Sequence, residues 1–300
     1  MFRFITERIG VKVALIVNLC LLVVIGGGGY FIIGQQTKNL EELMLDRAKM
    51  MSMLGAKTLG TVLDESIDNG VLTVGDAMDR EYVKIPGIEP AKYHTKYDAY
   101  LDKAILSFID EYIKDESVKY AVPADINGYV PTHNSIYQKP ITGDPQKDLT
   151  GNRTKRVFND PVGIAAAKNN VPGFRQVYKR DTGETMWDVS SPIFVKGQQW
   201  GGFRIGMSIV KITEYQTALI KSLVTVMAVI LVLSIILIFV VVNRALKKLG
   251  VLTEIASKLA DGEVDQNIMV QSNDEIGRLA GVLERLRISL KSAIERLSKR

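Results

Sequence analysis

Two arginines near the middle of the chain have the chemistry of an anion clamp. Arg153 and Arg156 lie close together in the sequence, and a guanidinium group can hold a carboxylate or a phosphate through two parallel N–H donors. Aromatic side chains can form the walls of such a site, and the candidates are Tyr129, Tyr178 and Trp187. The arginines can instead form ion pairs with acidic neighbours, namely Asp144, Asp148 and Asp160. The sequence therefore predicts a pocket for a small polar or anionic molecule and leaves the ion-pair alternative open.

Four further residues complete the predicted ligand-binding set: His133, Gln176, Asp188 and Arg204. Asp188 can bind a ligand amine or face water, and Tyr178 opposite Trp187 can be a structural cross-strand pair. His94 and His133 are the only histidines, and either can ligate a non-covalent haem iron. Because two isolated histidines lack ligand spacing, we expect no metal and no cofactor, and we keep a haem-bearing redox or gas sensor as the alternative.

Catalytic signatures are missing from the sequence. Cys20 is the only cysteine, which excludes an intramolecular disulfide, a thiolate metal cluster and covalent c-type haem attachment. The sequence contains no nucleophile elbow, Walker loop, zinc signature or dinucleotide fingerprint. We therefore expect a binding protein and not an enzyme.

Strands must position most of the predicted ligand-binding residues. Three runs, 174–180, 185–195 and 200–207, are separated by turn residues and predict an antiparallel meander. If the turns are Thr182-Gly183 and Gly197-Gln198, Tyr178 pairs with Trp187 and Ser191 pairs with Arg204. One face then carries Gln176, Tyr178, Trp187, Ser191 and Arg204. The apolar face, which we expect to pack on helices, carries Val177, Met186, Phe194, Phe203, Ile205 and Met207.

Helices and a second hairpin are predicted before these strands. Apolar residues recur at three- and four-residue spacing over 40–59 and over 97–113, as they do in amphipathic helices. Short strands at 119–124 and 129–132 flank Asn127-Gly128, a dipeptide that favours a tight hairpin. Asp160 before Pro161 predicts the start of a short helix that ends near Lys168.

Two apolar runs, 13–34 and 218–242, are long enough to cross a membrane as helices. The first run is too long for the core of a secretory signal and ends without a small-x-small cleavage site. Residues 1–12 carry a charge of +2 and residues 243–300 a charge of +3, out of a total of +5. The positive-inside rule then places both termini in the cytoplasm and residues 35–217 in the periplasm of a bacterial cytoplasmic membrane protein. The basic balance reports topology and indicates no nucleic-acid partner.

Behind the second run, the pattern predicts two short amphipathic helices joined by a linker. Their apolar stripes are Leu249, Leu252, Ile255, Ala256 and Leu259, and then Ile276, Leu279, Leu283, Leu286 and Leu290. Neither helix can bury its stripe alone, which favours a dimeric four-helix bundle.

The segments Ala-Asp-Gly-Glu-Val at 260–264 and Asn-Asp-Glu-Ile-Gly at 273–277 resemble the HAMP family. The resemblance covers 243–293, leaves 294–300 as a helix end, and departs from many members at Lys248, where they have proline. It implies a parallel homodimer that relays motion, with Gly262, Asp274, Glu275 and Gly277 as the relay residues.

The segments 125–134, 151–158 and 178–184 resemble the periplasmic sensor region of methyl-accepting chemotaxis receptors. This resemblance implies a Cache-type domain, in which a long helix flanks a PAS-like antiparallel sheet. Those receptors continue into a methylated coiled coil that contacts a kinase, whereas this chain stops at Arg300. We therefore expect the output on a kinase-linked or other cytoplasmic partner, or on a further C-terminal part.

These patterns predict an α+β membrane protein with two transmembrane helices, a Cache/PAS-like domain and a HAMP module. Its predicted function is to bind a small molecule outside the membrane and to shift the strand at 200–207, which leads into the second span. A helix displacement of about 1–2 Å is the usual scale of such a signal. A structural membrane scaffold without a ligand is the remaining rival.

Overall fold

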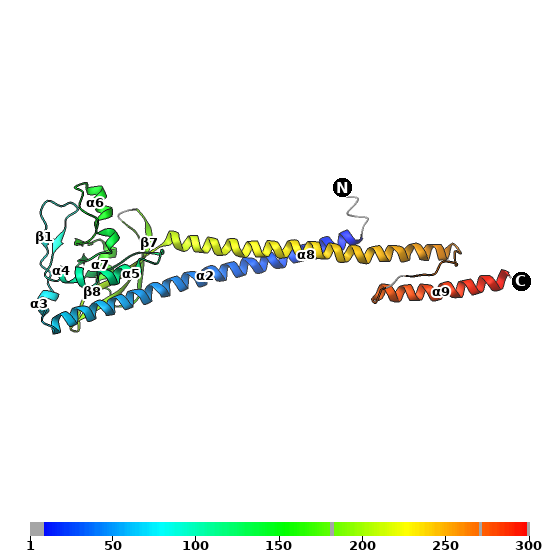
Figure 1. The fold of residues 1–300 in the computed structure, drawn as a ribbon, viewed down its shortest axis with the longest axis horizontal. Coiled ribbons are helices and arrows are strands. Elements are labelled where there is room, and N and C mark those ends of the chain that lie inside the picture. The colour runs from blue at the N-terminus through cyan, green and yellow to red at the C-terminus, as the bar shows by residue number, and fades with distance from the viewer. Residues whose placement is uncertain (1–8, 181–182, 270–271, 299–300) are drawn as a thin grey trace. The chain divides into compact units, whose positions relative to one another are not determined.

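The computed structural model describes residues 9–180, 183–269 and 272–298 and shows a mixed helix and sheet protein (Figure 1). The chain divides into two compact units. One unit, which we call the sheet domain, is Gly34–Ile220, and the other combines Met1–Ile33 with Lys221–Arg300.

Two long helices carry the apolar runs. Helix α2 spans Ile9–Asp68 and helix α8 spans Ile209–Ala260, and both are long and apolar enough to cross a membrane. Within their most apolar windows, 6% of α2 and 0% of α8 is buried, as expected for surfaces that face lipid. The amphipathic helix predicted over 40–59 is confirmed, because α2 continues through it without a break.

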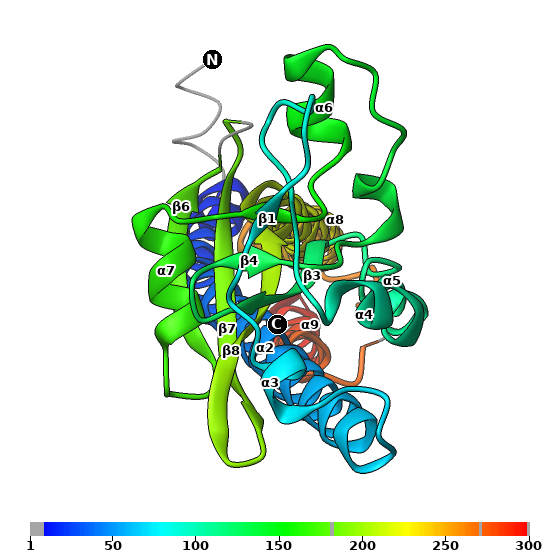
Figure 2. The same cartoon turned by 90° about the vertical axis from the view of Figure 1, so that its left-hand side faces the viewer.

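A four-stranded antiparallel sheet with the order β3-β8-β7-β6 forms the centre of the sheet domain (Figure 2). Its strands are β3 (Val118–Asp125), β6 (Phe174–Lys179), β7 (Thr185–Val195) and β8 (Gln198–Ser208). The predicted meander is confirmed, since β6 pairs with β7 and β7 pairs with β8. Strand β3 adds to the free edge of β8.

The predicted register of the meander is wrong by one residue at both connections. Trp187 pairs with Val177, not with Tyr178, and Arg204 pairs with Ser190, not with Ser191. The second turn is Lys196-Gly197, with φ of 48° and 78°, because two consecutive positive φ values give the hairpin turn that matches strand twist.

A shift of one residue moves every side chain of a strand to the other face. Trp187 therefore joins the core on the side of α2, and Met186 packs with Tyr120 and Val122 on the opposite side. Val177 and Phe194, predicted for the apolar core face, are 55% and 50% exposed.

The core lies between the sheet and the helices α2, α4 (Asp98–Ala104) and α5 (Leu106–Tyr112). Its buried side chains include Leu59, Leu63, Leu101, Ile105, Ile109, Phe203, Ile205 and Met207. The prediction that the last three of these residues pack on helices is confirmed. The helix predicted over 97–113 is present as two short helices, because the backbone leaves helical geometry at Ile105, where φ is −120°.

The opposite face of the sheet is covered by α7 (Pro161–Lys168) and by the small sheet of β4 (Tyr129–Val130) and β5 (Arg156–Val157). As predicted, Asp160 caps α7, because its carboxylate accepts hydrogen bonds from the amides of Val162 and Gly163, both at 3.0 Å. Short connecting elements complete the domain: α3 (Val74–Ala77), β1 (Val83–Lys84), β2 (Tyr93–His94), the 3-10 turn η1 (Ser135–Tyr137) and α6 (Pro145–Gly151).

The hairpin predicted around Asn127-Gly128 is wrong in its pairing. Gly128 does form a turn, with φ of +82°, but β3 pairs with β8 and β4 pairs with β5. The Asp125 carboxylate accepts hydrogen bonds from the amides of Asn127 (3.0 Å) and Tyr129 (2.9 Å). These bonds redirect the chain away from β3 and towards the segment that carries the predicted arginines.

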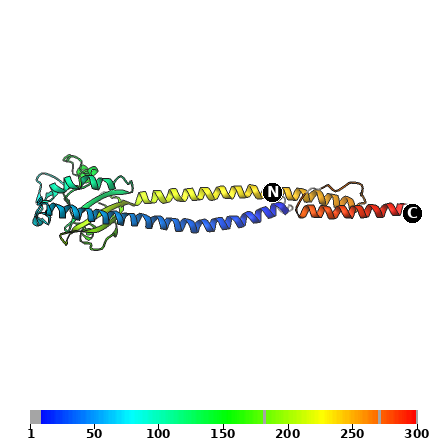
Figure 3. The same cartoon turned by 60° about the horizontal axis from the view of Figure 1, so that its bottom comes forward.

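In the second unit, the end of α8 lies side by side with α9 (Glu275–Ser298) (Figure 3). Their shared core contains Leu252, Leu259, Val264, Ile268 and Ala280. Leu279 and Leu286 from the predicted stripe are 43% and 50% exposed. A single chain thus leaves part of the apolar stripe uncovered.

Candidate functional site

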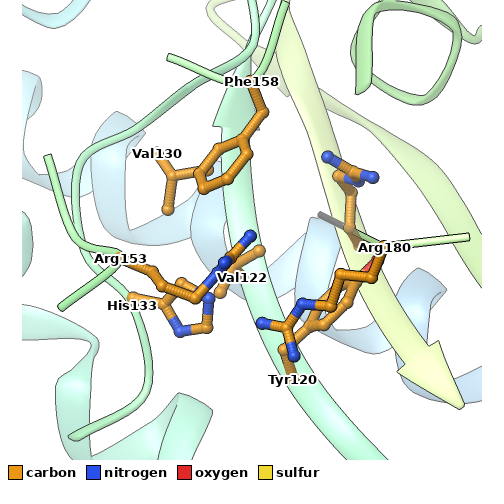
Figure 4. Close-up of a pocket in the computed structure, with 8 residues that line it drawn as sticks. Tyr120, Val122, Val130, His133, Arg153, Phe158 and Arg180 are labelled. Atoms are coloured by element: carbon orange, nitrogen blue, oxygen red, sulfur yellow. The ribbon is translucent and has the colours of Figure 1, made fainter. Parts of the chain in front are cut away.

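A small cavity opens on the face of the sheet that carries β4 (Figure 4). We call it the arginine pocket, and its lining consists of Tyr120, Val122, Val130, His133, Arg153, Phe158, Arg180 and Arg204. A neighbouring hollow shares Arg153, Phe158, Arg180 and Arg204 and extends to the start of α7 at Pro161. Figure 4 shows Arg153 and Arg180 entering from opposite sides.

Four arginines gather at this pocket from separate parts of the sheet domain. Arg153, Arg156, Arg180 and Arg204 are only 3%, 9%, 6% and 5% exposed. The guanidinium groups of Arg153 and Arg156 each lie 5.0 Å from the ring centre of Phe158, and both donate to the Leu149 carbonyl, at 3.0 and 3.1 Å. Buried guanidinium groups held by ring faces and carbonyls are fixed in place before any anion arrives.

Asp188 lies beneath the pocket, and it does not face water. It is fully buried, and its Oδ1 accepts hydrogen bonds from the Tyr120 hydroxyl (2.6 Å) and from Nε of Arg204 (3.0 Å). Its other carboxylate oxygen is buried without a hydrogen-bond partner among the described residues. Asp188 therefore orients Arg204 and offsets one of the pocket's positive charges.

His133 is a neutral hydrogen-bond donor in this setting. Burial, followed by the positive charges of Arg153 and Arg180, holds the pKa of the His133 imidazole well below its usual value of 6.5. Nδ1 accepts a hydrogen bond from the Asn134 amide at 2.8 Å, so the ring proton is on Nε2. His133 thus adds a neutral N–H to the charged donors of the arginines.

The chemistry of the lining favours an anion. Among the described residues that line the arginine pocket and its neighbouring hollow, Arg153, Lys179, Arg180 and Arg204 are cationic and Asp160 is acidic. The Asp160 carboxylate is already hydrogen-bonded at the start of α7. Guanidinium donors bind carboxylate, phosphate or sulfate oxygens through charge-assisted hydrogen bonds.

The acidic residues of the ion-pair alternative are engaged in local backbone contacts. Asp144 caps α6 by accepting from the amides of Gln146 and Lys147. Asp148 accepts from Thr142 and from the amide of Gly143, and hydrogen bonds from the Thr142 amide are the main reason that the pKa of its carboxyl is lowered. These contacts give the carboxylates of Asp144 and Asp148 a local structural role.

The structure brings together some of the predicted ligand-binding residues and separates others. His133, Arg153 and Arg204 line the pocket, and Arg156 and Asp188 adjoin it. The other four predicted residues are Gln176, Tyr129, Trp187 and Tyr178. The side chain of Gln176 donates to the Val162 carbonyl at 3.1 Å, and that of Tyr178 lies outside the described residues.

Tyr129 and Trp187 lie elsewhere in the core. The Tyr129 hydroxyl donates to the Tyr93 carbonyl at 2.9 Å, on the other side of β4 from Val130. Trp187 packs in the core on the side of α2, with the guanidinium of Arg175 at 5.2 Å from its ring. Neither residue lines the described part of the arginine pocket.

Tyr120, Arg180 and Phe158 are pocket residues that the prediction of the site missed. Tyr120 and Val122 alternate along β3 with Ala121, which faces the core on the other side of the sheet. The two-residue period of a strand could therefore have predicted that Tyr120 and Val122 share a face. Arg180 follows directly after β6, and the amide of Arg180 donates to the Glu184 carbonyl at 2.8 Å.

The predicted relay residues lie at the ends of helices in the second unit. Gly262 follows α8 with φ of +88°, and Asp274 caps α9 by accepting from the amides of Ile276 (3.0 Å) and Gly277 (3.2 Å). A Cβ on Gly277 would lie 1.8 Å from the Ser272 carbonyl oxygen, so only glycine fits there. Glu275 pairs with Arg278 on the surface at 2.6 Å.

A further pair, Glu284 and Arg287, fastens the linker to α9. The Arg287 guanidinium donates to the Val264 carbonyl at 2.8 Å and pairs with Glu284 at 2.6 Å. Glu284 also accepts from the amide of Ile268 at 3.0 Å. The hydrogen bonds from Arg287 and Ile268 lower the pKa of the Glu284 carboxyl to about 2.

Comparisons with known proteins identify one part of the chain. Residues 240–292 match the HAMP domain family, so α8 leads into a HAMP domain. No curated protein matches the chain.

Among solved structures, the chain is similar to the sensory domain of the Campylobacter jejuni chemoreceptor Tlp3 with isoleucine bound. The identity is 10% and the TM-score 0.30, over 60% of this chain and 65% of that one. It is also similar to an extracellular ligand binding receptor from Desulfohalobium retbaense, with 12% identity and a TM-score of 0.25, over 56% of this chain and 26% of that one. The chain thus spans less than two thirds of the length of either structure.

Proposed function

We propose that the chain is a transmembrane receptor, not an enzyme, that binds a small anionic molecule in the arginine pocket and relays the event through α8 to the HAMP domain. The observation that carries this proposal is the gathering of four buried arginines and a neutral histidine around one cavity. Guanidinium groups that converge on one cavity are suited to bind the oxygens of an anion through charge-assisted hydrogen bonds. The ligand class is a small carboxylate, phosphate or sulfate.

The route of the signal begins at Arg204, which lies on β8. Strand β8 ends at Ser208, and α8 begins at the next residue, Ile209. The joint is held by hydrogen bonds from the Ser208 amide to the Ser117 carbonyl (2.8 Å) and from the Ser208 hydroxyl to Glu184 (3.1 Å). An anion that pulls on Arg204 favours one position of β8 over another, and this difference in affinity biases the two states of the relay.

The receptor spans the cytoplasmic membrane of a bacterium, with the sheet domain in the periplasm and both termini in the cytoplasm. The basic residues that flank the apolar runs, such as Lys12, Arg244 and Lys247, support this orientation. The uncovered leucines of the HAMP helices support a homodimer, because a second copy can bury them in a four-helix bundle. The output passes to a cytoplasmic effector partner.

Thermal unfolding of the full chain in lipid nanodiscs tests ligand binding. A panel of organic acids, amino acids and phosphates should contain compounds that raise the unfolding temperature, because a ligand at 100 times its Kd stabilises the native state by about 2.7 kcal/mol. Arg153→Ala and Arg156→Ala should remove the shift. Arg175→Ala is the matched control, since this arginine lies against Trp187 on the opposite side of the sheet. An equal shift in all four proteins would overturn the proposed site.

The haem-bearing sensor has less support from the two histidines. His94 bonds through Nδ1 to Asp98 at 2.8 Å, whereas His133 lies in the arginine pocket with its Nδ1 bonded to Asn134. An absorption spectrum of the purified full chain tests this alternative. A Soret band that disappears in His133→Ala would support haem binding and count against an anion as the ligand.

A further inference from the structure

Lys92 is a buried cation just before β2, outside the arginine pocket. It is 4% exposed, although lysine is rarely buried unless its ammonium group is well satisfied. The ammonium donates to Oδ1 of Asn152 (2.6 Å), to the Asn152 carbonyl (3.3 Å) and to the Thr154 carbonyl. An ammonium has three N–H donors, and each has an acceptor here.

All three acceptors belong to the segment 152–156, which carries two of the pocket arginines. This segment is bent at Lys155, whose φ of 59° is uncommon for a residue with a side chain. It is tied to its neighbours by hydrogen bonds from the Lys155 amide to the Val130 carbonyl (2.8 Å) and from the Tyr93 amide to the Lys155 carbonyl (2.9 Å). The buried ammonium of Lys92 adds three hydrogen bonds to Asn152 and Thr154, just before the bend.

We propose that Lys92 is a positioning residue of the arginine pocket: its charged ammonium holds the segment 152–156 in the shape that directs Arg153 and Arg156 to an anion. The inference rests on the proposed anion-binding function. A neutral amine has only two N–H donors, so loss of the proton leaves one of the three oxygens unsatisfied and frees the bend. Anion affinity then falls when Lys92 is deprotonated, without any change in the arginines themselves.

The groups around Lys92 make deprotonation accessible. Burial is the largest cause that lowers the pKa of the Lys92 ammonium, to about 8, and the positive charges of Arg156 and Lys155 lower it further while Asp148 raises it. Lys155 is itself held by Asp98 (3.3 Å) and Asp102 (2.7 Å). His133, whose pKa lies well below 6.5, does not change its charge in the alkaline range.

Sulfate is a suitable probe, because it stays a dianion throughout the alkaline range. Calorimetric titration of the full chain in nanodiscs should give a sulfate Kd at pH 9.5 that is about tenfold or more higher than at pH 7, because a group with a pKa of about 8 is mostly protonated at pH 7 and mostly neutral at pH 9.5. Lys92→Arg keeps the charge and Lys92→Met removes it at every pH, so in both variants the ratio of the two Kd values should be near one. Lys84→Met, which alters an exposed lysine on β1, should keep the wild-type ratio.

The outcomes separate the two proposals. Suppose that sulfate binds at pH 7 and that binding depends on Arg153. Lys92 then has no positioning role if the wild-type Kd does not change with pH, or if Lys92→Arg loses affinity at high pH as steeply as the wild type. If sulfate fails to bind, or binds equally well to Arg153→Ala, the anion-binding function and the inference that rests on it are both overturned. If Lys92→Met does not fold, the pH dependence of the sulfate Kd in Lys92→Arg, which retains the charge, decides between these outcomes.

Discussion

Asp188 is a buried carboxylate that accepts hydrogen bonds from Arg204 and Tyr120, and both of these residues line the arginine pocket. Removing one member of a buried ion pair is expensive, because the other charge is left without compensation. Asp188→Ala should therefore lower the free energy of unfolding by about 3–5 kcal/mol, and Asp188→Asn should cost less because it retains an acceptor for Tyr120. Chemical denaturation measures both. A loss no larger than that of Asp46→Ala, at an exposed carboxylate, would contradict the structural role of Asp188.

His133 gives the sheet domain a specific dependence on pH. Its pKa in the folded state is well below the ordinary value of 6.5, because of burial and the nearby arginines. Above pH 6.5 the imidazole is neutral in both states and contributes nothing to the pH dependence. Below pH 6.5 the unfolded chain binds a proton that the folded chain does not, so stability falls as pH falls.

The test is the free energy of unfolding between pH 7 and pH 5. The wild type should lose stability over this range with a limiting slope of about 1.4 kcal/mol per pH unit, and His133→Gln should show a flatter profile. The carboxyls with lowered pKa, such as Asp76 and Asp148, release their stabilisation only nearer their ordinary value of 3.8. Equal slopes in the two proteins would show that His133 titrates normally.

The residue types in the sequence predicted a cluster of polar and basic side chains, but they predicted only some of the residues that line the pocket. Arg153 and His133 were identifiable because a guanidinium and an imidazole can bind a polar or anionic molecule, and both line the cavity. Tyr129 was misplaced because the side chains of a two-residue strand point in opposite directions, and the sequence does not say which one faces the sheet. Here Val130 faces the pocket and Tyr129 the core.

Helix α2 meets the sheet at Gly55, where the two elements approach closely. A Cβ at this position would lie 2.2 Å from the ring of Phe203, so Gly55→Ala forces α2 away from the sheet. We expect a net loss of about 1–3 kcal/mol from overpacking, despite the better helix propensity of alanine. Gly34→Ala is the control in the same helix, because nothing lies within 4 Å of its Cβ. A variant at Gly55 as stable as the control would disprove the close contact.

The strands themselves follow from the sequence, whereas their register does not. Both Gly197-Gln198 and Lys196-Gly197 are acceptable two-residue turns by composition, and the chain uses the second, with an irregularity in the pairing after Ile193. By itself this turn pairs Phe194 with Gln199 in place of Gly201, which lies on the same face of β8. The irregularity after Ile193 shifts the pairing by one residue, so Trp187 lies opposite Met207 and on the core face. The Asn127-Gly128 dipeptide also forms a turn without forming a hairpin. The reason is that the Asp125 carboxylate accepts hydrogen bonds from the amides of Asn127 and Tyr129.

Over the whole molecule, α8 follows directly after β8, the strand that carries Arg204, and continues into the residues that match the HAMP domain. It contacts α2 within the apolar segments, where Met227 lies against Gly29: a Cβ on that glycine would be 2.1 Å from the Met227 methyl group. Disulfide formation requires Cβ atoms within about 3.5–4.5 Å. A displacement of about 1–2 Å, the usual scale of a helix shift, is therefore large enough to change the rate of crosslinking at this contact.

The experiment uses Gly29→Cys with Met227→Cys in a Cys20→Ser background, since Cys20 is the only native cysteine. Under mild oxidation in membranes, the pair should crosslink within one chain, and an anion that stabilises the protein should change the rate several-fold. Arg153→Ala in the same background should abolish this change, because it removes the site and leaves the contact intact. Gly28→Cys with Met227→Cys should crosslink more slowly, as nothing lies within 4 Å of a Cβ at Gly28. Rates that are the same with and without the anion would mean that binding in the sheet domain does not move α8 against α2, and the relay would have to take another form.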